Sequence, residues 1–275
     1  RFHDVSDFGL GDDGGSNNNL VRLSSSECSA GRLGYFNNKA AVCSQSISSG
    51  VSYRNGREHQ KSQALTVFSM SKVGQYVYVI RWNFHDDGRI TPTIEATGAL
   101  QRLGTSAQRS HGWLVNASGQ IGLAHMHNFY WRLDFDLDGT SNNDVVKEIN
   151  FDSQQGRRYK RVSSFSREAA RSVSPQNMRT WLVQDGSSIN RKGHPISYEI
   201  RLEEAGQREV GPAFEAFTHN DIYITRARGC ELFASHNAQV NTCNANNLSE
   251  FVNGESIVNE DIVAWVGVSF YHMPR

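Results

Sequence analysis

The segment from His125 to Gly139 (HMHNFYWRLDFDLDG) constrains the fold of this chain more than any other. Read as a β-strand, it alternates its side chains between two faces, and the Asp138-Gly139 pair predicts a turn that ends the strand. His125 and His127 then lie on one face, roughly 6.5–7 Å apart along the strand, since each residue rises about 3.3 Å. Two imidazoles at this spacing can both reach one metal ion.

Two histidines separated by one residue also occur on sheets where they are only exposed or hydrogen-bonded, so a metal site needs a third ligand. The candidate is His272, at the end of the strand-like segment 261–271. Asp134 and Asp136 share a face farther along the first segment. Imidazole nitrogens suit a transition metal, whereas carboxylate oxygens suit a second, hard cation.

Most of the remaining chain predicts strands and turns, and the clearest short helix is expected at residues 166–171, with Ser166 as its N-cap. An Asp-Asp-Gly hairpin turn is expected at residues 86–88. With strands in the majority and no internal repeat, the chain is expected to be all-β: a large antiparallel β-sandwich with few short helices, formed by residues 1–275 as a single domain. The expected strands lie at residues 64–70, 76–84, 90–97, 112–115, 145–151 and 181–183, and residues 190–200 are expected to form a Gly-bearing turn followed by a further strand.

The composition excludes several classes of function. The 275 residues are 38% hydrophobic and 20% charged with a formal net charge of zero, which argues against disorder. Neutrality also argues against nucleic acid or an anionic membrane as a partner. No apolar run is long enough to span a bilayer, and no signal peptide is visible. The chain starts at Arg1 instead of methionine, which predicts a processed or partial product.

The cysteines fall into two pairs that are close in sequence, Cys28 with Cys43 and Cys230 with Cys243. Together with two Asn-x-Ser glycosylation sequons, they favour an oxidising setting and hence a secreted glycoprotein. The alternative is four reduced thiols in a cytosolic protein, although none of these cysteines has the spacing of a zinc site.

The segments around the three histidines resemble the copper-containing amine oxidases. Residues 125–139 are similar to the copper-ligand strand of that family, and residues 260–275 (EDIVAWVGVSFYHMPR) to the segment with its third copper histidine. The resemblance implies that His125, His127 and His272 bind Cu(II). It also implies a second site for Ca(II) or a similar hard cation, with only oxygen donors. Those donors would be Asp134, the Phe135 carbonyl, Asp136, Asp221 and the Ile222 carbonyl.

Residues 72–78 (KVGQYVY) resemble the family's Thr-x-x-Asn-Tyr-Asp/Glu motif. The resemblance implies that Tyr76 is the tyrosine that bound copper and dioxygen convert into the topaquinone cofactor. Lys72, Gln75 and Val77 depart from the motif. The Gln75 side chain keeps an amide but is one methylene longer, which would displace the hydrogen bond that holds the quinone ring, and Val77 cannot carry a charge.

Residues 4–11 (DVSDFGLG) resemble a second motif of the family, Asp-x-Gly-Glu-Tyr-Gly-x-Gly, whose first aspartate is the catalytic base. The resemblance implies that Asp4 is this base, although Ser6, Asp7 and Phe8 depart from the motif. Without the resemblance, Asp4 is an ordinary acidic turn residue. The loop from Cys28 to Cys43 is also similar to a disulfide-closed loop of the family.

Taken over nearly the whole chain, the resemblance implies a homodimeric enzyme that oxidises primary amines with dioxygen to an aldehyde, hydrogen peroxide and ammonia. A quinone derived from Tyr76 would condense with the amine, and Asp4 would abstract a proton from its α-carbon. The family's domain extends beyond both ends of the chain, so a second fragment of the same precursor is a candidate partner. The alternative is a catalytically inactive, secreted amine-oxidase-like glycoprotein that keeps the fold for a binding or structural role.

Overall fold

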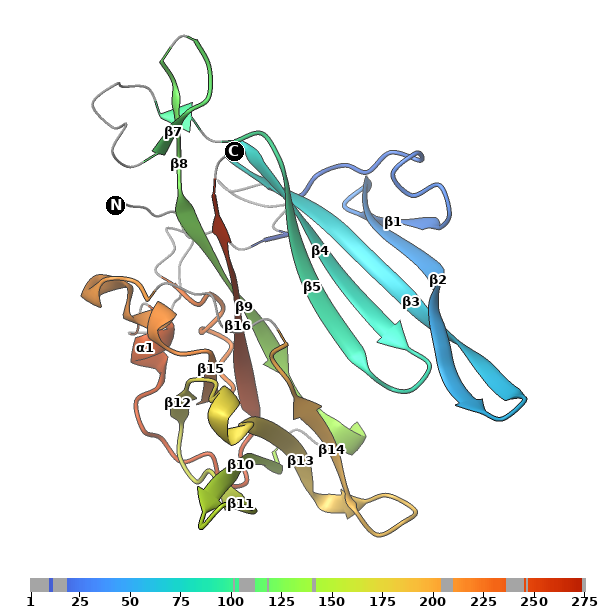
Figure 1. Cartoon of the computed structure of the whole chain (residues 1–275), viewed down its shortest axis with the longest axis vertical. Coiled ribbons are helices and arrows are strands. Elements are labelled where there is room, and N and C mark those ends of the chain that lie inside the picture. The colour runs from blue at the N-terminus through green and yellow to red at the C-terminus, as the bar shows by residue number, and fades with distance from the viewer. Residues whose placement is uncertain are drawn as a thin grey trace. The chain divides into compact units, whose positions relative to one another are not determined.

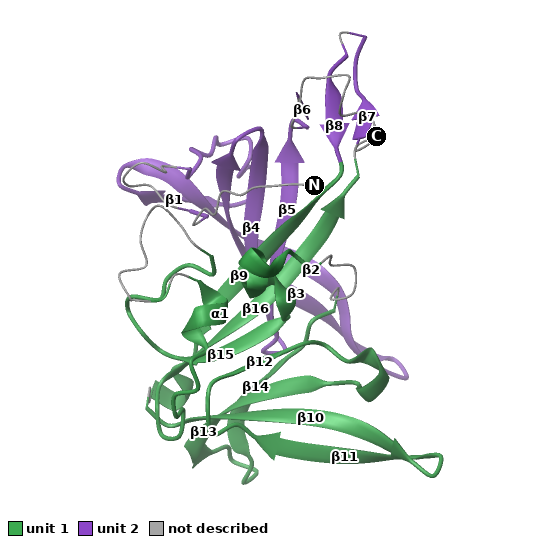
Figure 2. Ribbon diagram, turned by 90° about the vertical axis from the view of Figure 1, so that its left-hand side faces the viewer, with its two compact units in different colours: residues 1–7, 124–273 green, residues 8–123, 274–275 purple. Residues whose placement is uncertain are grey.

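The computed structural model describes residues 10–11, 19–100, 102–103, 112–117, 119–139, 142–203, 210–235, 245 and 247–273. The chain forms two compact units, which Figure 2 distinguishes by colour. Unit 1 comprises residues 1–7 and 124–273, and unit 2 comprises residues 8–123 and 274–275. The expectation of a single domain over residues 1–275 stays a prediction.

Unit 1 contains two four-stranded antiparallel sheets, with the strand orders β11-β10-β13-β14 and β12-β15-β16-β9 (Figure 1). The strands of the first sheet are β10 (Asp144–Gln154), β11 (Arg157–Ser164), β13 (Thr180–Ile189) and β14 (Pro195–Ile200). Those of the second are β9 (His125–Asp134), β12 (Ala169–Arg171), β15 (Ile222–Arg226) and β16 (Ile262–His272). The helical turns are η3 (Leu137–Gly139), η4 (Pro175–Asn177), η5 (Ala213–His219) and α1 (Leu248–Phe251).

The two sheets of unit 1 pack face to face around one apolar core. Val146 and Val183 contribute to it from the first sheet, and Ile224, Ile262 and Ala264 from the second. These residues occupy alternate positions of their strands, as expected for side chains that share one face of a sheet. The prediction of an all-β fold with an antiparallel sandwich is therefore confirmed.

The opposite face of the second sheet is buried as well. Val263 and Trp265 of β16 pack there with Tyr223 of β15, and Leu248 and Phe251 of α1 cover them. Because both of its faces are covered, β16 reads as an almost continuous apolar run from Ile262 to Val266 instead of an alternating pattern.

One buried carboxylate connects several strands of unit 1. Glu148 of β10 accepts hydrogen bonds from Asn150 Nδ2 at 2.7 Å and from Trp181 Nε1 at 3.3 Å. It also lies 3.4 Å from Arg171 Nε and 3.7 Å from Arg179 Nε. Since Arg171 belongs to β12 of the second sheet, this network joins the two sheets.

The helix predicted at residues 166–171 is wrong. Residues 169–171 form β12, which pairs with β15. The Glu168 carboxylate accepts hydrogen bonds from the backbone N–H groups of Arg226 at 3.0 Å and Asn253 at 2.9 Å, which holds the segment extended. The helical propensity of Glu-Ala-Ala is worth only tenths of a kcal/mol per residue, about an order of magnitude less than burial and pairing in a sheet contribute here.

Unit 2 contains a five-stranded antiparallel sheet in the order β1-β2-β3-β4-β5 and a three-stranded sheet in the order β6-β8-β7. Gly88 has φ +85° and donates its N–H to the His85 carbonyl at 3.0 Å, so the predicted Asp-Asp-Gly turn between β4 and β5 is confirmed. The strands are β1 (Arg32–Phe36), β2 (Lys39–Asn55), β3 (Glu58–Val73), β4 (Tyr76–His85), β5 (Ile90–Gly98), β6 (Arg102–Leu103), β7 (Gly112–Leu114) and β8 (Ile121–Leu123).

Cys28 and Cys43 form a disulfide, as predicted, and it packs with Phe68 and Val79 in the small core of unit 2. Cys230 is also disulfide-bonded, and Cys243 lies outside the described residues. Within the described ranges, none of the helices has the length and apolar character needed to cross a membrane.

The sandwich core of unit 1 predicts a large difference between two isoleucine-to-alanine substitutions. Ile224 is 0% exposed between the sheets, whereas Ile189 of β13 is 65% exposed. We expect Ile224→Ala to lower the free energy of unfolding by about 2–5 kcal/mol, and Ile189→Ala by less than about 0.5 kcal/mol. Urea-induced unfolding of both variants measures this, and equal losses would contradict a core centred on Ile224.

Candidate metal centre

The antiparallel pairing of β9 with β16 builds the site. Every residue of β9 pairs with β16, from Asp134 opposite Val263 to His125 opposite His272, without a bulge. The two strands run side by side along their whole length (Figure 1). Residues that are distant in sequence are therefore held opposite each other by consecutive backbone hydrogen bonds.

The structure brings the three predicted histidines together at one end of this ladder. His272 lies directly opposite His125, and His127 lies two residues farther along the same face. Their ring nitrogens lie within 4.8 Å of one another, and no other group of potential ligands in the described part of the chain converges as closely. The ring centroids are 4.6 Å apart for His125 and His127, and 5.0 Å for His125 and His272.

Burial favours the neutral, metal-binding form of two of the three histidines, His127 and His272. The His127 ring is buried and stacks on Phe270, with the ring centroids 4.6 Å apart. Burial lowers the pKa of His127 to about 3, and the neighbouring His125 and His272 lower it further in the same direction. Burial, with a smaller contribution from His125, also lowers the pKa of His272. Three imidazoles on a rigid sheet are a donor set that fits Cu(II).

Acidic side chains gather at the opposite end of the same ladder. Asp134 ends β9, Asp136 follows two residues later, and Asp261 directly precedes β16. Burial raises the pKa of Asp261, and repulsion from Asp134 and Asp136 raises it further. Asp144, the first residue of β10, joins them from the other sheet and accepts a hydrogen bond from Ile262 N at 3.3 Å.

The structure does not bring Asp221 and Ile222 to this acidic end. The Asp221 carboxylate accepts a hydrogen bond from Val173 N at 2.8 Å, and its carbonyl accepts one from Gly267 N at 2.7 Å. Gly267 lies four residues along β16 from Val263, the partner of Asp134, which is roughly 13 Å. Asp261 and Asp144 lie near Asp134 and Asp136 instead, and neither was predicted from the sequence. The pairing of His125 with His272 is the signal that would have identified Asp261, since it sets the register of the whole ladder.

The remaining predicted site residues do not belong to the β9–β16 ladder. Tyr76 begins β4 in unit 2, is 7% exposed and pairs with Gly98, and its ring centroid lies 6.2 Å from that of Tyr78. Gln75 is exposed in the turn before β4, where its carbonyl accepts a hydrogen bond from Ala99 N at 2.9 Å. Asp4 lies outside the described residues.

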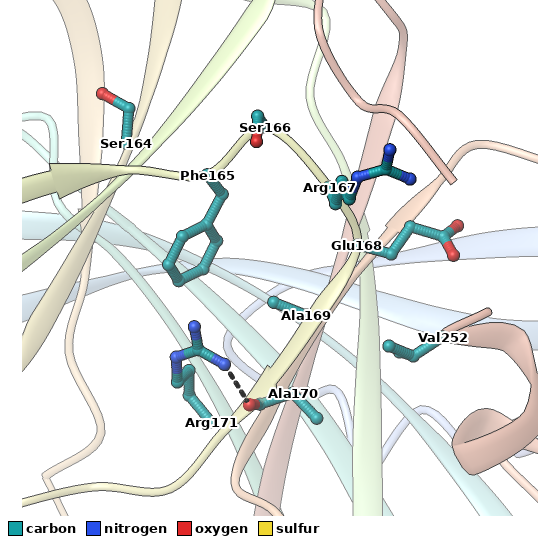
Figure 3. A pocket seen from close by; sticks show the side chains of 9 residues that line it. All are labelled: Ser164, Phe165, Ser166, Arg167, Glu168, Ala169, Ala170, Arg171 and Val252. Carbon is teal, nitrogen blue, oxygen red and sulfur yellow. Dashed lines mark hydrogen bonds between the residues drawn. The ribbon is translucent and has the colours of Figure 1, made fainter. Parts of the chain in front are cut away.

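A hollow of about 430 Å³ lies beside the edge strand β12 of unit 1 (Figure 3). Residues 164–171 and Val252 line it, and none of the predicted site residues does. The Arg171 guanidinium lies 4.9 Å from the centroid of the Phe165 ring and donates a hydrogen bond to the Ala170 carbonyl at 2.8 Å. The hollow and the group of three histidines therefore have no residue in common.

Comparisons with known proteins point to one family. Residues 38–275 match the family described as "Copper amine oxidase, enzyme domain". The chain is 27% identical over 243 residues to amine oxidase [copper-containing] gamma 2 of Arabidopsis thaliana, covering 79% of this chain and 35% of the relative. It is also 27% identical over 241 residues to the primary amine oxidase of Klebsiella aerogenes, covering 77% of this chain and 32% of the relative. The chain thus spans about a third of the length of these relatives.

Solved structures share the fold. The copper-containing benzylamine oxidase from Hansenula polymorpha superposes with a TM-score of 0.71 at 20% identity, covering 86% of this chain and 41% of that protein. The amine oxidase of Aspergillus nidulans superposes with a TM-score of 0.69 at 21% identity, covering 86% and 35%. The family match extends over the three histidines and the ladder that positions them, and on this basis the chain belongs to the copper amine oxidase enzyme-domain family.

Proposed function

We propose that this chain is the catalytic part of a copper-dependent primary amine oxidase. One observation carries the proposal: His125, His127 and His272 converge on one face of the β9–β16 ladder in a family defined by a copper enzyme domain. A structural pair of histidines would not need a third imidazole from a strand more than a hundred residues away in the sequence.

The three imidazoles would hold copper, and this ion would supply redox chemistry with dioxygen. The contribution of the chain itself is to fix the donors. Phe270 packs on His127 and excludes water from one side of the ring, and the ladder sets the spacing between His125 and His272. Little reorganisation is then needed when the ion binds, because the supporting shell already orients its ligands.

Tyr76 is our candidate for the precursor of the topaquinone, a group that supplies a carbonyl electrophile and an electron sink for oxidation of a primary amine. Its burial at the start of β4 supports this role, since a reactive ring must be kept from bulk water. Asp4 is the proposed base that removes the proton from the α-carbon of the amine. The products would be an aldehyde, hydrogen peroxide and ammonia.

The second candidate function is a catalytically inactive amine-oxidase-like protein, and the surroundings of Tyr76 favour it. Gln75 is exposed in its turn, and Val77, at the next position of β4, places an apolar side chain where the family motif has a carboxylate. Both candidates keep the copper ligands, so copper binding alone does not distinguish them.

We also propose a site for calcium or a similar hard cation at the acidic end of the ladder. Asp134, Asp136 and Asp261, with the Phe135 carbonyl, take the place of the donor set that included Asp221 and Ile222. Support comes from the mutual repulsion of these carboxylates, which a cation would relieve. We also propose that the protein is secreted and glycosylated and that it forms a homodimer. A second fragment of the same precursor is a further candidate partner.

The oxidase proposal predicts a covalent adduct on Tyr76. After loading with copper in air, phenylhydrazine should give a coloured product, and mass mapping should place it on the peptide that contains Tyr76. Tyr76→Phe should bind copper and give no adduct, whereas Tyr35→Phe, at an exposed position of the same unit, should behave as the wild type. An unmodified Tyr76 in copper-loaded wild-type protein would contradict the oxidase proposal and favour the inactive alternative.

The lowered pKa of His127 predicts how the stability of the metal-free protein depends on pH. Because the pKa of His127 falls from 6.5 to about 3 on folding, the unfolded chain binds more protons between these values. The contribution of neutral His127 to the free energy of unfolding is fully present above about pH 6.5. It is lost as the pH falls toward 3, by about 2 kcal/mol between pH 7 and pH 5.

Urea unfolding of chelator-treated protein at a series of pH values measures this effect. His127→Gln should reduce the dependence on pH, whereas His59→Gln, at an exposed position, should keep it. A dependence in His127→Gln as steep as that of the wild type would mean that another group is responsible.

A further inference from the structure

We propose that Asp144 supplies an additional carboxylate ligand to the cation site from the opposite sheet, so that one bound ion joins the two sheets of the unit 1 sandwich. The inference rests on the cation site proposed above and adds to it a donor that the sequence did not indicate. The other carboxylates belong to the ends of β9 and β16 in the second sheet, whereas Asp144 begins β10 in the first.

The Asp144 carboxylate lies in a buried environment in which a cation would stabilise its charge. The residue is 2% exposed, and its Oδ2 atom accepts a hydrogen bond from Ile262 N at 3.3 Å. Its Oδ1 atom is buried and has no hydrogen-bond partner among the residues that the structure describes. A buried carboxylate oxygen without a donor is costly unless a positive charge compensates for it.

The neighbours of Asp144 show where that compensation would come from. Burial raises the pKa of Asp144 to about 7, and repulsion from Asp261, Asp136 and Asp134 contributes in the same direction, so the carboxylate faces the acidic group. Asp261 Oδ1 is buried and, within the described ranges, also has no hydrogen-bond partner. Two buried oxygens without donors, on segments from both sheets, therefore lie beside the same pair of acidic side chains.

The charge balance favours a cation over a further arginine or lysine. The ion pair that involves this group joins the exposed Asp134 to Arg132 Nη1 at 3.1 Å. Asp144 is buried and Asp261 is half-buried, and among the described residues no ion pair reaches either of them. A small divalent ion can reach buried oxygens that a long basic side chain cannot enter, and calcium accepts six to eight oxygen ligands in flexible geometry.

The carboxylates do not converge as closely as the histidine nitrogens do. Binding therefore requires rotation of the aspartate side chains about their torsions, while the backbone of β9, β10 and β16 stays in place. Calcium tolerates such variable geometry, whereas magnesium demands near-ideal octahedral geometry. The site should consequently prefer calcium to magnesium.

The test is calcium titration of the full chain after removal of bound metal, followed by calorimetry and by the shift in melting temperature. Wild type should bind calcium and melt at a higher temperature with it. Asp144→Asn keeps the shape of the side chain and an acceptor for Ile262 N, yet should weaken calcium binding by about tenfold or more and reduce the shift. Without calcium it should melt at or above the wild-type temperature, because a buried charge is gone.

Two further variants separate this inference from the proposal on which it rests. Asp261→Asn should also weaken calcium binding. Asp221→Asn should leave calcium affinity unchanged, since Asp221 is engaged with Val173 N far along the ladder.

If Asp261→Asn loses calcium while Asp144→Asn keeps wild-type affinity, the inference fails and the cation site stands. If the wild type binds no calcium, both fail, and if Asp221→Asn is the variant that loses calcium, the donor set expected from the sequence is the correct one. Should Asp144→Asn not fold, Asp144→Ser replaces it. Terbium luminescence lifetimes in H2O and D2O then give a second readout, because loss of the Asp144 ligand should admit an additional water to the ion.

Discussion

The unbroken ladder between β9 and β16 is the constraint on which the chemistry of unit 1 depends. It sets His272 opposite His125 at one end and Asp134 opposite Val263, next to Asp261, at the other. The period of a strand is two residues, so a slip by one position would turn His272 to the opposite face and remove the third imidazole. The same slip would shift Asp261 relative to Asp134. A single register therefore determines both the histidine group and the acidic group.

Burial on both faces fixes that register. Ala264 and Ile262 face the core between the two sheets, while Val263 and Trp265 face the second core beneath α1. A slip would exchange small side chains with large ones in two close-packed interiors at once, and each misfit costs on the order of kcal/mol. The histidines lie on the extension of the face that carries Ala264. Their spacing is thus maintained by packing that includes none of them.

The sequence was sufficient to place His125 and His127 on one face, because a two-residue period needs no knowledge of distant segments. His272 came from its position at the end of a second strand-like segment and from the resemblance to the family. The helix expected at residues 166–171 failed because Glu168 finds its hydrogen-bond donors in residues far along the chain, which a local propensity does not contain. Asp221 was assigned to the cation site through the resemblance to the family. The sequence alone does not show which strand pairs with the segment that follows Asp221, so this assignment could not be checked against a register. Once His272 is placed opposite His125, however, antiparallel pairing brings Asp261 beside Asp134 without further information.

The departures from the family motif at Gln75 and Val77 change the chemical surroundings of Tyr76 more than they change its position. Gly98 pairs with Tyr76 at φ +103°, and a Cβ atom there would lie 2.5 Å from the Gln75 carbonyl oxygen, so the backbone of this turn depends on Gly98 and hardly on the side chains at positions 75 and 77. Those side chains can change while the tyrosine stays at the start of β4. Neither side chain takes part in the pairing of β9 with β16. The proposed metal binding and the proposed formation of a quinone therefore depend on different parts of the chain, and loss of the second need not disturb the first.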